Sequence, residues 1–446
     1  MRSNASGRLT VSKVKRIRNT LQEFSLPLIF GVVAGLVVAN LNDHLYHDLV
    51  HYKPLGDAVI LGHEITLHFL INDIFMVLFF GIAAKEITES VLPGGALNPP
   101  SKAINPLLGT LGGVLGPVVF FFIFASMFMS DGIENVMGAI TSSITPGIQV
   151  DYSAPEVLFR GWGIPTATDI ALAWLVAKIV FGATHPAVNF LLLLAVADDA
   201  IGLGIIAVFY PDPKHPAAPE WLGLVLLGML VAYGLRRVNV KKWTPYIFVG
   251  GFLSWLGLLE AHLHPALALV PIVPFLPGPE RDLGLFVEEE EEEDEDDQGH
   301  GHGHGHAHSP LEEFEHQLKA FVDFGLFFFA FANAGVKLDS VGTITWVILS
   351  ALLVGKTIGI FIFAWGGSLL GFPLPEGMRI KHLIVAGVVA GLGLTVALFV
   401  TGEAYPNEGL ADALQGPAKM GAVFSAGAGI LAIILGKILK VHQKDG

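Results

Sequence analysis

The chain has 446 residues, of which 52% are hydrophobic and only 15% are charged, whereas soluble domains carry about 25% charged residues. This balance excludes an ordinary soluble enzyme. The net charge of −14 is concentrated in one run, Glu288 to Asp297, which holds ten of the 40 acids, so that the other 30 nearly balance the 26 bases. The absence of cysteine excludes disulfides, iron–sulfur clusters and thiolate chemistry.

Apolar stretches long enough to cross a bilayer recur along the whole chain. A hydrocarbon core of about 30 Å needs about 20 helical residues, and twelve stretches qualify, although the sixth to eighth are short. A transmembrane β-barrel would instead show strands of about ten residues in strict alternation. We therefore predict an all-α polytopic membrane protein, with spans that begin near residues 25, 69, 105, 157, 187, 221, 244, 262, 321, 342, 380 and 417.

Basic residues near the span ends predict the orientation. The N-terminal segment, residues 1–24, holds six Lys or Arg from Arg2 to Arg18 with no acid among them, and such charge favours the cytoplasmic side. With twelve spans, the connections near residues 86, 235 and 371 face the same side and also carry Lys or Arg. Both termini, including residues 441–446, are therefore expected in the cytoplasm.

Residues 42–66, between the first two spans, are too polar to cross the bilayer. From Asp57 to His68 the residues alternate roughly as a pair of strands around Gly62 and His63 would. We expect a small β-hairpin on the outer side of the membrane, within a first transmembrane region that covers residues 25–280.

The fourth predicted span is interrupted, because GWGIPTATDIALAW carries Gly163 and Pro165 just before Thr168 and Asp169. Proline and glycine free backbone groups, and free groups are tolerated at membrane depth only beside a cavity. The eleventh span is interrupted in the same way by three glycines before Thr395. Close packing of small residues is the alternative explanation for the glycines alone.

Four charged residues fall inside apolar segments, where each costs about 2.5 to 3.5 kcal/mol at mid-bilayer and should face a cavity or a partner. They are Asp169, Asp198, Asp199 and Lys356. Two adjacent carboxylates on a helix point about 100° apart, so one can face a cavity while the other contacts a neighbouring helix. This arrangement suits ion binding with a supporting salt bridge. A charge network that only fixes helix packing would account for one lone Asp better than for all four.

A loop over residues 281–312 separates the first transmembrane region from the second, residues 313–440. From Glu288 to His308 it consists of ten acids followed by alternating glycine and histidine, and so uniform a composition cannot form a core. The histidines could bind transition metals, but we favour a solvated cytoplasmic loop with only opportunistic affinity for them.

The placement of these features suggests an internal symmetry. The interrupted spans are the fourth and the eleventh, each the middle member of a triplet, with the Asp pair in the fifth span and Lys356 in the tenth. Matching broken segments point to an inverted repeat around a binding site near the middle of the membrane.

Six stretches together resemble the NhaA-type sodium/proton antiporters over most of the chain. They are INDIFMVLFF (71–80), GWGIPTATDIA (161–171), LLLLAVADDAIGLGIIAVFY (191–210), FAFANAGVKL (329–338), VGKTIGI (354–360) and GVVAGLGLTVALF (387–399). The resemblance implies two unwound, crossing helices and a homodimer in the bacterial inner membrane. It also implies electrogenic, pH-regulated exchange of Na⁺ or Li⁺ for H⁺, in the service of sodium and pH homeostasis.

By the same resemblance, Asp199 and Asp198 carry Na⁺ and protons, and Lys356 partners Asp198. Thr168 and Asp169 belong to the crossed pair, where Asp169 would compensate helix ends that each carry about half a charge. No nucleotide motif or bound cofactor is evident, so we expect the proton gradient to drive transport.

The chain departs from the family at residues linked with pH sensing. Lys85 to Ser90 keeps Glu86 but not the usual Lys, Arg and Glu, and Lys319 follows Glu315 and His316 where another histidine is common. His264 matches a histidine after the seventh span. Glu86, His264, Glu315 and His316 are therefore candidate pH-regulating residues, with ordinary solvated helix ends as the alternative.

Two other classes of membrane protein can be weighed against this interpretation. An intramembrane aspartyl protease needs two carboxylates on different helices, which adjacent Asp198 and Asp199 do not provide. An organic-anion carrier of similar architecture would be expected to place fewer fixed carboxylates around its substrate. The solute that dissipates a proton gradient distinguishes the three.

Overall fold

The computed structural model describes residues 26–57, 59–60, 63–93, 95, 100–129, 136–145, 154–210, 218–279 and 309–441. The predicted N-terminal segment, the run from Glu288 to His308 and residues 442–446 lie outside these ranges.

The first part of the chain, up to residue 279, is built almost entirely of helices, with η1 and η5 as π-helical turns and η3, η4, η6 and η7 as 3-10 helices. In chain order the elements are α2 (Leu26–Leu41), α3 (Asp43–Val50), β1 (Val59–Ile60), β2 (His63–Glu64), α4 (Leu67–Phe69), η1 (Leu70–Phe75), α5 (Met76–Ser90), α6 (Pro100–Met129), α7 (Val136–Ser143), η3 (Pro155–Thr166), α8 (Ile170–Phe181), α9 (Pro186–Phe209), η4 (Pro219–Trp221), α10 (Leu222–Arg237), η5 (Tyr246–Gly251), α11 (Phe252–Glu260), η6 (Pro265–Leu267) and η7 (Val273–Phe275).

The second part begins at Pro310 and is also helical, with the 3-10 turn η8 and the π turn η9. Its elements are α12 (Pro310–Ala334), η8 (Leu338–Ser340), α13 (Thr343–Ser350), η9 (Ala351–Gly355), α14 (Lys356–Leu369), α15 (Ile380–Ala390), α16 (Leu394–Ala404), α17 (Gly409–Phe424) and α18 (Gly427–Ile438).

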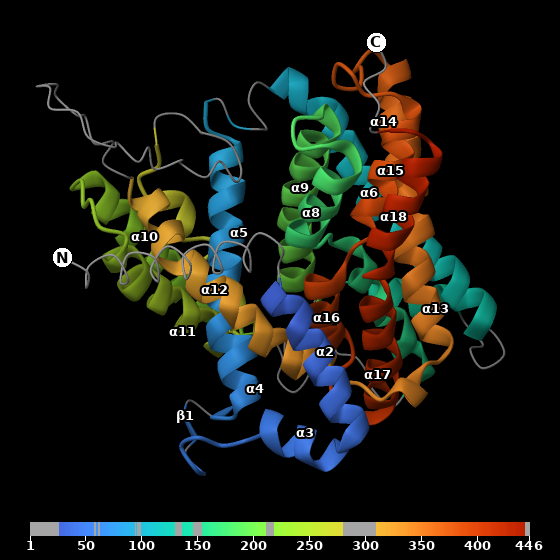
Figure 1. The fold of residues 1–446 in the computed structure, drawn as a ribbon. Helices are drawn as coiled ribbons and strands as arrows, with labels where there is room; N and C mark the ends of the chain where they lie inside the picture. The colour runs from blue at the N-terminus through green and yellow to red at the C-terminus, as the bar shows by residue number, and fades with distance from the viewer. Residues whose placement is uncertain are drawn as a thin grey trace, which may run out of the picture.

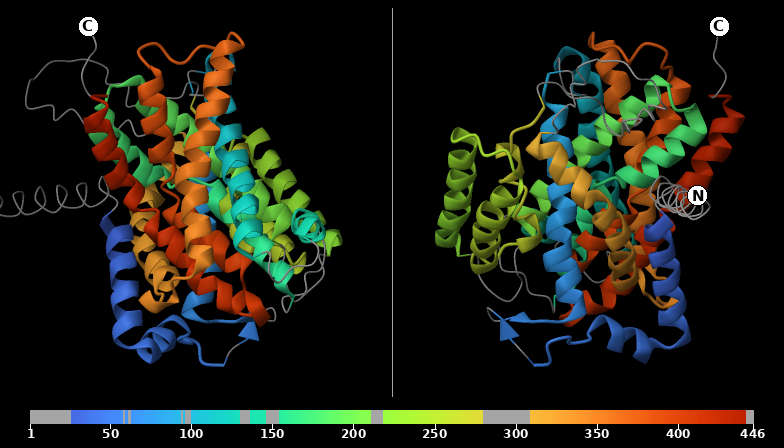
Figure 2. Two further views of the ribbon diagram at one scale, coloured as in Figure 1. Left: turned by 90° about the vertical axis from the view of Figure 1, so that its right-hand side faces the viewer. Right: turned by 60° about the vertical axis from the view of Figure 1, so that its left-hand side comes forward.

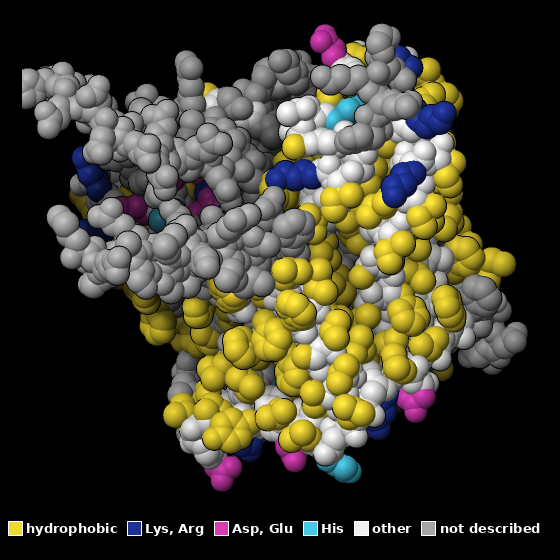
Figure 3. Space-filling view, in the orientation of Figure 1, with side chains coloured by type: hydrophobic (Ala, Val, Ile, Leu, Met, Phe, Trp, Pro, Cys, Tyr) yellow, Lys and Arg dark blue, Asp and Glu magenta, His cyan; other side chains and the backbone are white. Residues whose placement is uncertain are grey.

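Length and composition identify the membrane-spanning elements. Among the described residues, six helices are long and apolar enough to cross a membrane, or eight if each of two bent helix pairs counts as one span. On the face in Figure 3, hydrophobic side chains cover the middle of the molecule, while most charged side chains lie toward its two ends. The chain is thus a multi-pass membrane protein, as the composition predicted. Twelve spans remain a prediction, because residues 262–279 hold only turns and short 3-10 helices.

The helices form a bundle with α3 and β1 at one end and the last turn of α18 at the other (Figures 1 and 2). In both figures α10 and α11 lie beside α5 at one edge, and α13, α14 and α18 lie toward the opposite edge. Helices α8, α9, α15 and α16 stand between these edges, and α9 is buried along most of its length.

The predicted hairpin over residues 42–66 has only a short paired segment in the described residues. β1 and β2 are antiparallel, with Val59 opposite Glu64 and Ile60 opposite His63. The first part of the range forms α3 instead, because Asn42 caps the helix by accepting a hydrogen bond from the Leu45 N–H at 3.1 Å. Lys53 Nζ lies 2.9 Å from Glu64 Oε2, and this hydrogen bond raises the pKa of Lys53. A fuller hairpin remains a prediction.

Helices α6 and α14 approach each other through glycine. A Cβ atom built at Gly112 would overlap the Gly359 carbonyl oxygen, and one at Gly359 would overlap the Gly112 carbonyl oxygen. Gly116 and Gly355 meet one helical turn away in the same manner. The two backbones are therefore in direct contact, which is how small residues spaced by four let membrane helices pack. This contact fixes the position of Lys356, the first residue of α14.

The start of α12 lies beside the end of the first described part of the chain. The Leu311 N–H donates a hydrogen bond to the Pro277 carbonyl at 3.2 Å. Ser309 starts α12 with a capping box, in which its hydroxyl accepts from the Glu312 N–H and Glu312 Oε2 accepts from the Ser309 N–H. The two ends of the acidic and histidine-rich loop thus leave the bundle side by side.

Candidate functional site

Two bent helix pairs meet in the middle of the bundle. η3 and α8 are bent by 50° around residues 167–169, and α15 and α16 are bent by 48° around residues 391–393. The Asp169 N–H donates to the Leu392 carbonyl at 2.6 Å, and Thr168 Oγ1 lies 3.0 Å from the Ala390 carbonyl oxygen. Each break therefore satisfies backbone groups of the other, as unwound segments at membrane depth require.

Asp169 binds the starts of two helices at once. Its Oδ1 accepts from the Leu172 N–H at 3.1 Å and so caps α8. Its Oδ2 accepts from the Thr395 N–H at 3.2 Å and from Thr395 Oγ1 at 2.8 Å, in the first turn of α16. A helix start carries about half a positive charge, so one buried carboxylate compensates two helix dipoles.

Asp198 and Lys356 form an ion pair with both side chains fully buried. Lys356 Nζ lies 2.8 Å from Asp198 Oδ2 and donates a second hydrogen bond to the Thr166 carbonyl at 2.6 Å. Thr168 Oγ1 also lies 2.9 Å from Asp198 Oδ2. These contacts hold one carboxylate oxygen, as a buried charge pair requires. They join α9 and α14 to the end of η3.

Asp198 and Asp199 each have one carboxylate oxygen with no hydrogen-bond partner among the residues that the structure describes. Asp198 Oδ1 and Asp199 Oδ1 are buried and accept no hydrogen bond from the described residues. The charged groups that act electrostatically on Asp199 are Asp198, Glu86, Asp169 and Lys356. Buried polar atoms are nearly always satisfied, so two such oxygens on adjacent residues indicate a site that a cation or a proton can fill.

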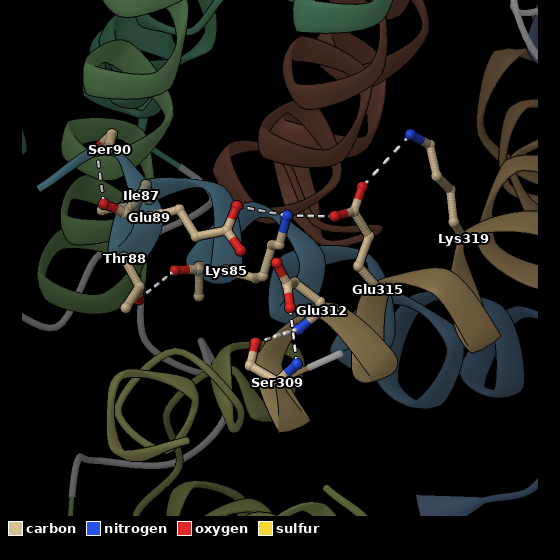
Figure 4. A network of polar contacts seen from close by, with 10 residues as sticks. Lys85, Ile87, Thr88, Glu89, Ser90, Ser309, Glu312, Glu315 and Lys319 are labelled. Atoms are coloured by element: carbon tan, nitrogen blue, oxygen red, sulfur yellow. Dashed lines mark hydrogen bonds and ion pairs between the residues drawn. The ribbon is translucent and has the colours of Figure 1, made fainter. Parts of the chain in front are cut away.

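The candidate pH-regulating residues are divided between two places. Glu86 follows Lys85 on α5, and Lys85 Nζ contacts Glu315 Oε2 on α12 and Glu89 Oε2 at 2.6 Å (Figure 4). Glu315 Oε1 also lies 3.3 Å from Lys319 Nζ. The cluster lies on α5 and α12, and α5 contacts α9, the helix that carries the two aspartates.

The other two candidates lie outside that cluster. His264 Nε2 lies 3.0 Å from Glu403 Oε1, at the end of α16, and the His264 ring contacts Phe399. His316 is next to Glu315, but its side chain is exposed. The structure therefore brings Lys85, the neighbour of Glu86 in the chain, into contact with Glu315, whereas His264 pairs with Glu403.

Several residues of the site were not singled out from the sequence. Lys85 and Glu89 are spaced by four, the spacing of an ion pair along a helix, and this signal could have found them. In the sequence Thr395 is only the residue that follows three glycines, although it donates two hydrogen bonds to Asp169. The Thr166 carbonyl carries no signal in the sequence, because it is a backbone group.

Comparisons with known proteins match antiporters over nearly the whole chain. A family model described as Na+/H+ antiporter 1 matches residues 16–139 and 129–439. A protein of Desulfitobacterium hafniense is 54% identical over 97% of this chain and 98% of its own length, and one of Geobacter metallireducens is 53% identical over 95% and 98%. A protein of Jannaschia sp. is 39% identical over 96% of this chain and 99% of its own length. All three are named Na(+)/H(+) antiporter NhaA.

Proposed function

The chain belongs to the Na⁺/H⁺ antiporter 1 family, and we propose that it exchanges Na⁺ or Li⁺ for H⁺ at Asp198 and Asp199. It is a secondary transporter rather than an enzyme, and its substrates are sodium ions and protons. The observation that carries the proposal is the pair of buried carboxylate oxygens that have no hydrogen-bond partner in the described part of the chain and lie beside two helix breaks.

Exchange follows from competition for the same oxygens. Na⁺ and Li⁺ are hard ions that bind oxygen ligands, and Oδ1 of Asp198 and of Asp199 are available for this. A proton bound to either carboxylate removes negative charge and occupies a ligand position. Sodium binding therefore releases protons, and protonation releases sodium.

Lys356 sets the charge balance of the cycle. With Na⁺ absent, protonation of Asp199 leaves the Asp198–Lys356 ion pair neutral overall. When Na⁺ binds both carboxylates, Asp198 shares its charge between the ion and Lys356, which weakens the ion pair. The weakened ion pair then releases a second proton, in addition to the one that leaves Asp199, so more than one proton is exchanged for each sodium ion. The exchange is therefore electrogenic and is driven by the proton gradient.

Alternating access is assigned to the two helix breaks. The hydrogen bonds between residues 168–169 and residues 390–392 join two bent pairs that occupy matching places in the chain. If these hydrogen bonds broke and formed again with other partners, each helix pair could move while Asp169 still compensated the dipole charge at both helix starts. The matching places of the pairs support the inverted repeat predicted from the sequence.

We assign the protein to the bacterial inner membrane, as a homodimer with both termini in the cytoplasm and a role in sodium and pH homeostasis. The basic N-terminal segment supports this orientation. Glu86 and Glu315 would pass changes in cytoplasmic pH to Asp199. Lys85, next to Glu86, contacts both Glu315 and Glu89. His264 and His316 are the second set of proposed pH-regulating residues, and His264 would act through Glu403.

The test is a transport assay in membrane vesicles from cells that lack their own antiporters. A proton gradient is established and reported by a pH dye, and Na⁺, Li⁺, K⁺ and Ca²⁺ are added in turn. We expect Na⁺ and Li⁺ to dissipate the gradient and K⁺ and Ca²⁺ to have little effect. Dissipation by an organic anion, with no response to Na⁺, would contradict the proposal.

A further inference from the structure

The first half of the broken fourth span has an unusual helical form. η3 is a 3-10 helix of 12 residues, Pro155–Thr166, whereas such helices rarely exceed about four residues because their hydrogen bonds are poorly aligned. All residues from Val157 to Thr166 are buried. Something outside η3 must therefore compensate for the weaker internal bonds.

Two buried tyrosines hydrogen-bond to the backbone of η3. Tyr210, which follows α9, accepts from the Gly163 N–H at 3.0 Å and donates to the Arg160 carbonyl at 2.6 Å. Tyr405, which follows α16, donates to the Leu158 carbonyl at 2.5 Å. In the reverse direction, Arg160 Nη2 donates to the Phe209 carbonyl at 3.1 Å. η3 is thus bound to the ends of the two helices that carry the aspartates and Thr395.

The residues of η3 opposite the two hydroxyls are glycines, and the fit requires them. A Cβ atom built at Gly163 would lie 2.5 Å from Tyr210 Oη, and one built at Gly161 would overlap Tyr405 Oη. Any side chain at either position would displace the hydroxyl. Each contact therefore requires a glycine in η3 as well as the tyrosine that faces it.

We propose that Tyr210 and Tyr405 are positioning residues for exchange, which hold η3 in its extended 3-10 form and so place Thr166 and Thr168 against Lys356 and Asp198. This inference rests on the proposed function. The two hydroxyls bind the backbone of η3. Each acts through η3, whose last carbonyl accepts the second hydrogen bond of Lys356.

The 3-10 form has a mechanical consequence. An α-helix of the same 12 residues would be shorter by about 6 Å, since the rise per residue falls from about 2.0 to 1.5 Å. Release of the tyrosines would let η3 shorten or leave α9 and α16. In the proposed orientation η3 lies on the extracytoplasmic side of the aspartates. Loss of a hydroxyl should therefore favour states in which the site opens to that side.

The experiment measures the apparent KM for Na⁺ from both sides of the membrane, in inside-out and right-side-out vesicles. Tyr210→Phe and Tyr405→Phe keep the rings and remove only the hydroxyls. For Tyr405→Phe we expect the ratio of cytoplasmic to external KM to rise about fivefold, the effect on a two-state equilibrium of losing one buried hydrogen bond. Tyr210→Phe loses two hydrogen bonds to η3 and should raise the ratio further. Use of two variants keeps the test valid if one of them fails to fold.

Tyr246→Phe is the matched control, because Tyr246 is equally buried and donates a hydrogen bond to the Val240 carbonyl away from η3. Its KM ratio should equal that of the wild type. Gly163→Ala, which displaces the Tyr210 hydroxyl, should behave like Tyr210→Phe. An unchanged ratio in both tyrosine variants, or equal changes on the two sides, would overturn the proposal. Absence of sodium-dependent proton movement in the wild type would instead contradict the proposed function itself.

Discussion

Asp198 and Asp199 are adjacent, but their surroundings give them different roles. Lys356 and Thr168 hold one oxygen of Asp198, so Asp198 is fixed in direction and partly neutralised. Asp199 Oδ1 accepts no hydrogen bond from the described residues. In the proposed mechanism, Asp199 is therefore the carboxylate that depends most on a bound ion or proton, and Asp198 is the one that depends on its lysine.

Asp199→Asn is expected to abolish exchange. The amide keeps the size of the side chain but can neither release a proton nor carry negative charge, so the competition between Na⁺ and H⁺ is lost. Sodium-induced dequenching of a pH dye in inside-out vesicles, between about pH 6 and pH 9, measures this. Asp48→Asn, on the exposed face of α3, is the matched control and should exchange normally. Full activity of Asp199→Asn at matched protein amounts would rule out the ion-competition mechanism.

Substitutions of Lys356 are expected to impair exchange to different degrees, depending on the residue that replaces it. Lys356→Arg keeps the positive charge but replaces a compact ammonium by a planar group, so some exchange should remain with an altered pH profile. Lys356→Ala leaves Asp198 buried without its partner and should lower the free energy of unfolding by about 3 to 5 kcal/mol. Transport and thermal unfolding in detergent measure the two effects. Equal transport and stability in the Ala variant and the wild type would contradict the role of the ion pair.

At the scale of helices, the contact between α6 and α14 leaves no space for a side chain. Gly359→Ala should destabilise the protein by about 1 to 3 kcal/mol, since the added methyl group forces the backbones apart, and should weaken exchange by shifting Lys356. Gly366→Ala on the same helix is the control, because a Cβ atom there meets nothing within 4 Å. Thermal unfolding in detergent compares them. Similar unfolding temperatures for the two variants would show that the contact is not tight.

The site was more predictable than the elements that support it. Charges in apolar segments and glycine or proline before them are exceptions to membrane composition, so Asp169, Asp198, Asp199 and Lys356 could be identified without coordinates. Tyr210 could not, because aromatic residues at span ends are common. The helix α3 was not predicted, because residues 42–66 were interpreted as one polar hairpin region from the alternation after Asp57, and the helix cap at Asn42 was not used.

At the scale of the whole molecule, deletion of residues 288–308 is expected to leave transport largely intact. The hydrogen bond between Leu311 and Pro277 brings the ends of the loop together, so the shortened connection still spans the gap. The deletion could change sensitivity to pH or to transition metals only through the removed acids and histidines. Vesicle transport with and without the segment measures this. Loss of all exchange by a deletion variant that still folds would contradict the prediction.

A second prediction at this scale concerns the proposed homodimer. Val59 in β1 is exposed, and a short unpaired strand edge can pair with another copy through backbone hydrogen bonds. Removal of residues 57–64 should therefore weaken the oligomer in detergent. Light scattering coupled to size exclusion reports the mass. An unchanged dimer after this deletion would show that other surfaces hold the copies together.

The double cap at Asp169 also bears on how the protein is made. Asp169 and Thr395 are 226 residues apart, so synthesis at about 5 to 20 residues per second separates them by about 10 to 45 s. During this interval α16, which shares the Asp169 carboxylate with α8, has not yet been made. One side of the proposed ion site is therefore missing. We expect an unfinished chain to be unable to form the transport pathway, which would protect the cell from leaks during membrane insertion.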